Sequence, residues 1–148
     1  MTTPASPPRG IASVLMLLGL VLAVTTQLVT GFVMMAHFNA AWLTAHIAGG
    51  IVTIVLILAE WAWLALAPAG RYKLRGLFAR SSGPKEWSEG LFLIVVTLTV
   101  VFGALTAAIM YLGASLPFAT LLTTHQGLAI TVAALYLAHS ALSMRRKR

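Results

Sequence analysis

Four long apolar stretches dominate the sequence, and each is long enough to cross a bilayer as a helix. They cover about residues 11–35, 41–66, 90–112 and 118–144, whereas a membrane-spanning helix needs about 20 mainly apolar residues. The first stretch is uncharged and longer than the apolar core of a signal peptide, and no convincing cleavage site follows it. We therefore interpret it as a retained helix.

Shorter, more polar segments separate these stretches. The connection over 36–41 is very short, so the first two helices should form an antiparallel hairpin. Residues 67–89 form a longer connection with glycine and proline breakers, in which 72–80 is compatible with a short basic surface helix. We expect an all-α fold, an integral-membrane four-helix bundle of two tandem helical hairpins over residues 11–144. A disordered N-terminal tail over 1–10 and a basic C-terminal tail over 145–148 flank it.

Composition and charge support a membrane protein. The 148 residues are 59% hydrophobic and 9% charged, with a mean hydropathy of +0.93, too much apolar surface for a soluble core of this size. The net charge is +7, and all ten basic residues lie at Arg9, in 71–85 or in 145–148. A four-span chain places these segments on one side, which the positive-inside rule makes cytoplasmic, together with both termini. Attraction to anionic lipid explains this charge, and we expect no nucleic-acid partner.

Several kinds of chemistry are excluded by composition. The chain has no cysteine, which excludes disulfides, c-type haem attachment and cysteine-ligated iron–sulfur clusters. It has no aspartate, and its membrane region carries a single glutamate, Glu60, too few for a di-metal carboxylate site. A protein-bound metal would need histidine, carboxylate or methionine ligands.

Histidines are the rare polar residues of the apolar stretches. His125 and His139 are fourteen residues apart in the last stretch, about 21 Å of helix rise and nearly the same face. A weak internal repeat aligns His46 with His125 and Glu60 with His139. The same register aligns Ile51 with Ile130, Leu56 with Leu135, Leu58 with Leu137 and Ala59 with Ala138. We interpret the two hairpins as parallel repeats related by a pseudo-two-fold axis.

His46 and His125 should lie at one depth, roughly 6 to 10 Å below the outer surface. Two imidazoles facing each other across a bundle can take both axial positions of a haem iron. Small residues would make room for the macrocycle: Gly49, Gly50 and Gly127 near the histidines, with Gly31, Gly103 and Ala107 on the other helices. The alternative is close helix packing, with each histidine hydrogen-bonded to a neighbouring carbonyl.

At the inner level the same geometry would place Glu60 opposite His139. Three interpretations remain open: a structural polar pair, a pair that handles protons or binds quinone, or a second haem with His139 as one ligand. His37 lies at the outer interface, either solvated or in contact with a quinone head group or a haem propionate.

The four-span layout, the His46–His125 pair and the His125–His139 spacing resemble bacterial membrane b-type cytochromes. These include cytochrome b561-like proteins and the haem-carrying membrane subunits of formate dehydrogenases. The resemblance implies haem b held by His46 and His125, electron exchange with a quinone or a redox partner protein, and a multi-pass location in the bacterial inner membrane. Glu60 stands where a two-haem member would carry another histidine.

The sequence thus predicts a membrane electron-transfer protein that binds one haem b between the second and fourth spans, with a second haem left open. Such a chain is an electron carrier or an oxidoreductase subunit rather than a stand-alone enzyme. Two alternatives are a haem-free structural anchor and a quinone-linked or haem-modifying enzyme that uses Glu60 and His139 as acid–base groups.

Overall fold

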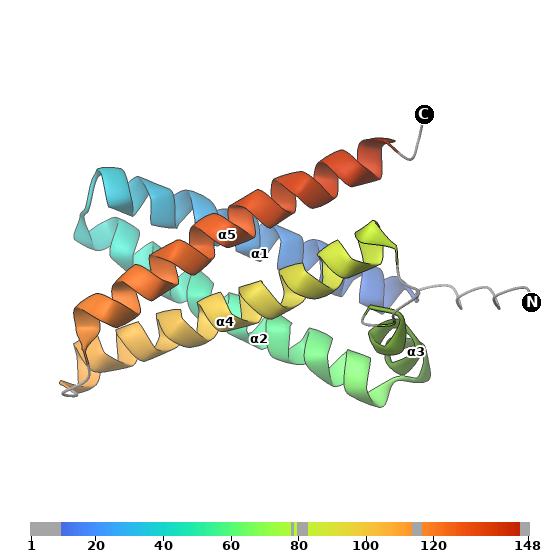
Figure 1. The fold of residues 1–148 in the computed structure, drawn as a ribbon. Coiled ribbons are helices and arrows are strands. Elements are labelled where there is room, and N and C mark those ends of the chain that lie inside the picture. Colours follow the sequence, from blue (N-terminus) through green and yellow to red (C-terminus); the bar gives the residue numbers. More distant parts are fainter. Residues whose placement is uncertain (1–9, 78, 80–82, 114–116, 146–148) are drawn as a thin grey trace, which may run out of the picture.

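The protein is a bundle of four long helices and one short one (Figure 1), seen in a computed structural model that describes residues 10–77, 79, 83–113 and 117–145. The long helices are α1 (Ile11–Ala36), α2 (Ala40–Leu66), α4 (Pro84–Leu112) and α5 (Phe118–Arg145), and the short one is α3 (Pro68–Leu77). Each long helix is apolar enough to span a membrane. The prediction of an all-α, multi-pass membrane protein is confirmed. Of the two expected tails, residues 1–9 and 146–148 lie outside the described residues.

Local sequence signals explain where the helices begin and end. The Asn39 side chain accepts a hydrogen bond from the Trp42 backbone N–H at 2.9 Å and caps the start of α2. Gly113 has φ +64°, a left-handed conformation that glycine adopts without strain, and it ends α4. Pro68 and Pro84 are the first residues of α3 and α4. Proline suits this position because the first helical N–H has no intrahelical partner, so these helices begin earlier than 72 and 90, where the sequence predicted them.

Helix α3 folds back closely onto the end of α2. A Cβ at Gly70 would overlap the carbonyl oxygen of Trp63 and lie 2.8 Å from the Cα of Leu64. Only glycine allows two backbones to approach this closely. Leu77 is also buried, whereas Arg71 and Arg75 are exposed. The short helix is therefore a basic, amphipathic segment that is packed against the bundle.

The long helices pair into two hairpins that cross each other. Helix α1 packs along α2, α4 packs along α5, and α2 and α4 provide contacts between the hairpins. The turn at 37–39, the end of α4 and the start of α5 lie at one end of the bundle, called here the connection end, and α3 lies at the other, the α3 end (Figure 1). Helices α2 and α5 are near each other at the connection end and diverge strongly towards the α3 end.

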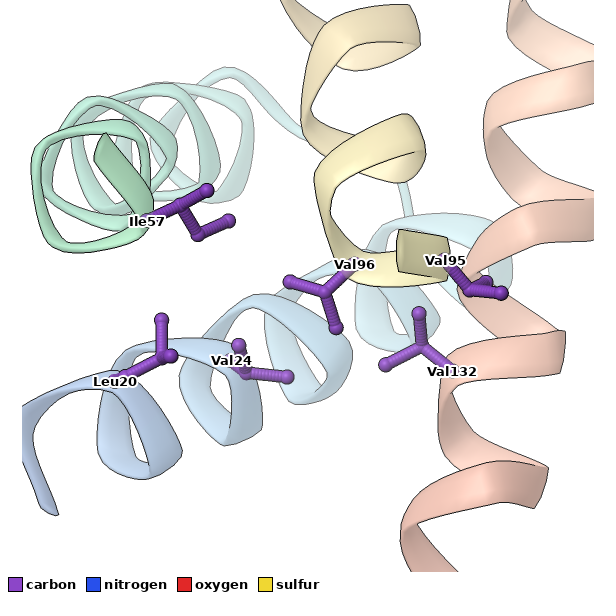
Figure 2. Packing of buried hydrophobic residues seen from close by; sticks show 6 residues of the cluster. All are labelled: Leu20, Val24, Ile57, Val95, Val96 and Val132. Atoms are coloured by element: carbon purple, nitrogen blue, oxygen red, sulfur yellow. The ribbon is translucent and has the colours of Figure 1, made fainter. Parts of the chain in front are cut away.

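A small core joins all four long helices. Leu20 and Val24 of α1, Ile57 of α2, Val95 and Val96 of α4, and Val132 of α5 form one buried cluster (Figure 2). Many other large apolar side chains point outwards; Leu58 and Leu137, for example, are 63% and 68% exposed. Such a surface would be costly in water and suits the hydrocarbon of a bilayer.

Candidate functional site

His46 of α2 and His125 of α5 face each other between the two hairpins. Their ring centres are 6.1 Å apart, with an angle of 71° between the ring planes. Both residues are half-buried. The sequence prediction that these two histidines come together at one level is confirmed. They lie in the half of the bundle nearer the connection end, where α2 and α5 approach each other.

The hydrogen bond of His125 defines which of its ring nitrogens carries the proton. Its Nδ1 lies 2.8 Å from the backbone carbonyl oxygen of Thr99 on α4. A carbonyl can only accept, so Nδ1 must carry hydrogen and donate it. In the neutral ring, Nε2 then holds the free lone pair, which is the form that binds metals.

His46 reaches the same protonation pattern through a different partner. Its Nδ1 lies 2.9 Å from Oγ1 of Thr30 on α1. That hydroxyl is in turn 2.8 Å from the Thr26 carbonyl oxygen and 3.2 Å from that of Gln27. Because the hydroxyl has one hydrogen and donates it to these carbonyls, it accepts from Nδ1–H of His46. Nε2 of His46 therefore also has a free lone pair.

Both histidines line a large apolar cavity of about 790 Å³ between the hairpins. Apolar side chains from all four long helices make up most of its wall, and Phe38 and Phe118 place one side of it near the connection end. Within the described part of the chain, neither histidine makes a hydrogen bond through Nε2. Cavities of 300–1,000 Å³ are typical of sites for small molecules and cofactors.

Two glycines allow the imidazoles to lie close to the neighbouring helices. A Cβ at Gly103 of α4 would be 2.8 Å from Cε1 of His125 and 3.1 Å from its Nδ1. A Cβ at Gly31 of α1 would be 3.3 Å from Cε1 of His46. Each hairpin thus presents a glycine to the histidine of its second helix, and both glycines line the cavity.

The three glycines expected to pack against a haem lie in different environments. Gly50 lines the cavity, as that prediction requires. Gly49 instead makes room for the side-chain amide of Gln27, with which a Cβ would clash. Gly127 is exposed, and a Cβ there would meet no atom within 4 Å. Space beside the histidines comes from α1 and α4, because those are the helices against which the imidazoles pack.

Gln27 adds an unusual polar group to the cavity wall. Its Nε2 is buried and has no hydrogen-bond partner among the described residues. Sequence analysis did not single out Gln27 or Thr30, although a polar residue within the apolar stretch 11–35 is a usable signal. The carbonyl of Thr99 has no such signal, since every residue has one.

The expected pair of Glu60 and His139 does not form, because the structure gives each residue another partner. Glu60 is 5% exposed, and its Oε1 lies 3.7 Å from Nζ of Lys73 on α3. His139 Nδ1 lies 3.0 Å from Oγ of Ser88 on α4. The prediction assumed parallel helices, whereas α2 and α5 diverge towards the α3 end. Glu60 therefore helps to hold α3 against the bundle.

His37 is exposed just after α1, where both of its interpretations stay open. Among the described residues, no cluster of three or more histidine, cysteine, aspartate or glutamate side chains is arranged to hold a metal ion. Two facing histidine rings, those of His46 and His125, are therefore the ligands that this site offers among the described residues.

Comparison with protein-family models, with curated proteins and with solved structures found no match.

Proposed function

We propose that this chain is a membrane-bound b-type cytochrome in which His46 and His125 are the axial ligands of one haem b. The observation that carries the proposal is the separation of 6.1 Å between the two ring centres. A metal–imidazole bond is about 2 Å long, and roughly 1 Å separates the ring nitrogen from the ring centre, so two opposed ligands have centres about 6 Å apart.

The hydrogen bonds support ligation by both rings. Each Nδ1–H is donated to an oxygen on a neighbouring helix, from Thr30 or Thr99. Metal-bound histidines almost always donate their other N–H in this way, which fixes the ring orientation and leaves Nε2 for the metal. Histidines that served only to join helices would not need two free Nε2 atoms on one cavity.

The cavity favours a porphyrin over a bare metal ion. Protein sites for single ions supply most ligands themselves, usually four for zinc, whereas this site offers two. A porphyrin brings four nitrogens of its own and a large apolar surface that suits a cavity of about 790 Å³. When bound, haem b supplies one-electron redox chemistry, and its potential depends on the ligands, on burial and on nearby hydrogen bonds.

The protein's own residues would fix the ligands and exclude water. Gly31 and Gly103 let the rings approach, and the apolar wall keeps the site dry. One haem fits the structure better than two, because His46 and His125 pair with each other, and Glu60, the residue expected opposite His139, is paired with Lys73 instead. The hypothesis of an enzyme with a Glu60–His139 acid–base pair loses its geometric basis for the same reason.

We propose the bacterial inner membrane as the location, with both termini and the basic helix α3 on the cytoplasmic side. The haem then lies nearer the outer face. Electrons would pass between it and a quinone or a redox partner protein. His37, exposed at the connection end, is either solvated or in contact with a quinone head group or a haem propionate, and none of these roles makes it an iron ligand.

Titration of the purified, haem-depleted protein with hemin tests the proposal. The wild-type chain should bind one haem and give the spectrum of a six-coordinate, low-spin iron. His46→Ala and His125→Ala should each lose that spectrum, whereas the matched control His37→Ala should keep it. An unchanged spectrum and affinity in His125→Ala would show that the ligand assignment is wrong.

A further inference from the structure

The two proposed ligands differ in what their Nδ1–H groups donate to. His125 donates directly to a backbone carbonyl, which no side-chain substitution can remove. His46 donates to a side-chain hydroxyl, that of Thr30. The two proposed ligands are therefore alike, whereas the acceptors of their Nδ1–H groups differ: one is a side-chain hydroxyl and the other a backbone carbonyl. Only the bond on the His46 side can be changed by replacing a single side chain.

Thr30 is well fixed for this role. It is 6% exposed, and its hydroxyl donates to the carbonyl of the preceding helical turn at 2.8 Å. A hydroxyl that donates its own hydrogen is polarised and becomes a better acceptor for a second bond. Other threonines in α1, such as Thr25, make the same kind of backbone bond but are exposed. Thr30 thus shares its backbone hydrogen bond with exposed threonines of α1 and differs from Thr25 in being buried and in contact with His46.

We propose that Thr30 is a positioning residue that raises the electron density of His46 and so lowers the reduction potential of the haem; this rests on the function proposed above. Donation from Nδ1–H makes an imidazole more basic at Nε2. A more basic ligand stabilises the oxidised, more positive iron over the reduced iron. Removing the acceptor should therefore raise the potential.

Thr30→Val tests this because valine keeps the shape of threonine and lacks the hydroxyl. Only the part of this hydrogen bond that strengthens when the iron is oxidised changes the ratio of oxidised- to reduced-haem affinities, which should therefore fall by up to about tenfold. A tenfold change corresponds to 59 mV for a one-electron couple. Redox titration should show an upward shift of up to that size in Thr30→Val. The wild-type potential should persist in Thr30→Ser, which restores the hydroxyl, and in the control Thr25→Val.

A merely structural role predicts a different result. If Thr30 only packs α1 against α2, Thr30→Val should bind haem with the wild-type potential, and this would overturn the proposal. A shift of equal size in Thr25→Val would also overturn it, because that residue does not contact His46. A downward shift in Thr30→Val would contradict the sign of the effect.

Nitrogen NMR of ¹⁵N-histidine-labelled, haem-depleted protein separates failure of this inference from failure of the proposed function. The wild-type His46 ring should be protonated at Nδ1, whereas Thr30→Val should populate both tautomers. If the wild-type chain bound no haem, the proposed function and the tuning role would both fall, whatever the NMR result. If haem bound but the His46 tautomer did not depend on Thr30, the inference alone would fall.

Discussion

Gly103→Ala offers a quantitative test of how closely the protein holds His125. The new Cβ would lie 2.8 Å from Cε1, 3.1 Å from Nδ1 and 3.5 Å from Nε2 of the imidazole. Carbon atoms in favourable contact are about 3.5–4.0 Å apart, so the ring must move by roughly 1 Å. That displacement would lengthen the 2.8 Å bond to the Thr99 carbonyl and move Nε2 away from the position that binds iron.

The expected cost combines two effects. Overpacking costs about 1–3 kcal/mol, and the weakened hydrogen bond costs about 0.5–1.5 kcal/mol. A total of about 2–4 kcal/mol would reduce haem affinity roughly thirty- to a thousandfold, because each 1.4 kcal/mol is a factor of ten. Hemin titration of the haem-depleted protein, followed by absorbance, measures this directly.

A graded series controls for the effect of adding a methyl group to a helix. Gly31→Ala should weaken binding less than Gly103→Ala, because its Cβ would be 3.3 Å from the nearest atom of His46. Gly127→Ala, where a Cβ meets no atom within 4 Å, should leave affinity unchanged and stabilise α5 slightly. Equal affinities in Gly103→Ala and Gly127→Ala would refute the reasoning.

Two further substitutions test other parts of the site. His139→Ala should leave the haem content of the purified protein unchanged, because His46 and His125 pair with each other and Glu60, the residue expected opposite His139, is paired with Lys73. A loss of half the haem, measured as pyridine haemochrome, would instead establish a second haem. Gln27→Leu should raise the free energy of unfolding of the haem-depleted protein by about 1 kcal/mol, because it removes a buried amide nitrogen that has no partner among the described residues. Thermal unfolding in detergent measures this change. A less stable Gln27→Leu protein would show that the amide is satisfied in the membrane-extracted state.

The sequence predicted most of the fold because apolar stretches of membrane length have few alternatives. The short connection after α1 required a hairpin, and Pro68 and Pro84 marked helix starts that the expected boundaries missed by a few residues. The crossing of the two hairpins could not be predicted, because it depends on how side chains such as Val96 and Val132 fit together.

The same crossing explains why the site was predicted only in part. Equal depth along the two helices was enough to predict that His46 and His125 lie close together near the connection end. Equal depth did not predict the partners of Glu60 and His139 correctly, because α2 and α5 diverge with distance from that end. The two ligands donate hydrogen bonds to the hydroxyl of Thr30 and the carbonyl of Thr99. These acceptors could not be predicted, because they depend on rotamers and on the contacts between helices, which the sequence pattern does not encode.

The most direct test of the central claim is the visible spectrum of the purified wild-type protein, recorded oxidised and then after reduction with dithionite. A haem held by two histidines predicts a sharp Soret band that shifts on reduction, together with split α and β bands in the b-type range. A protein expressed with ample haem that shows no such bands would contradict the assignment of His46 and His125 as haem ligands.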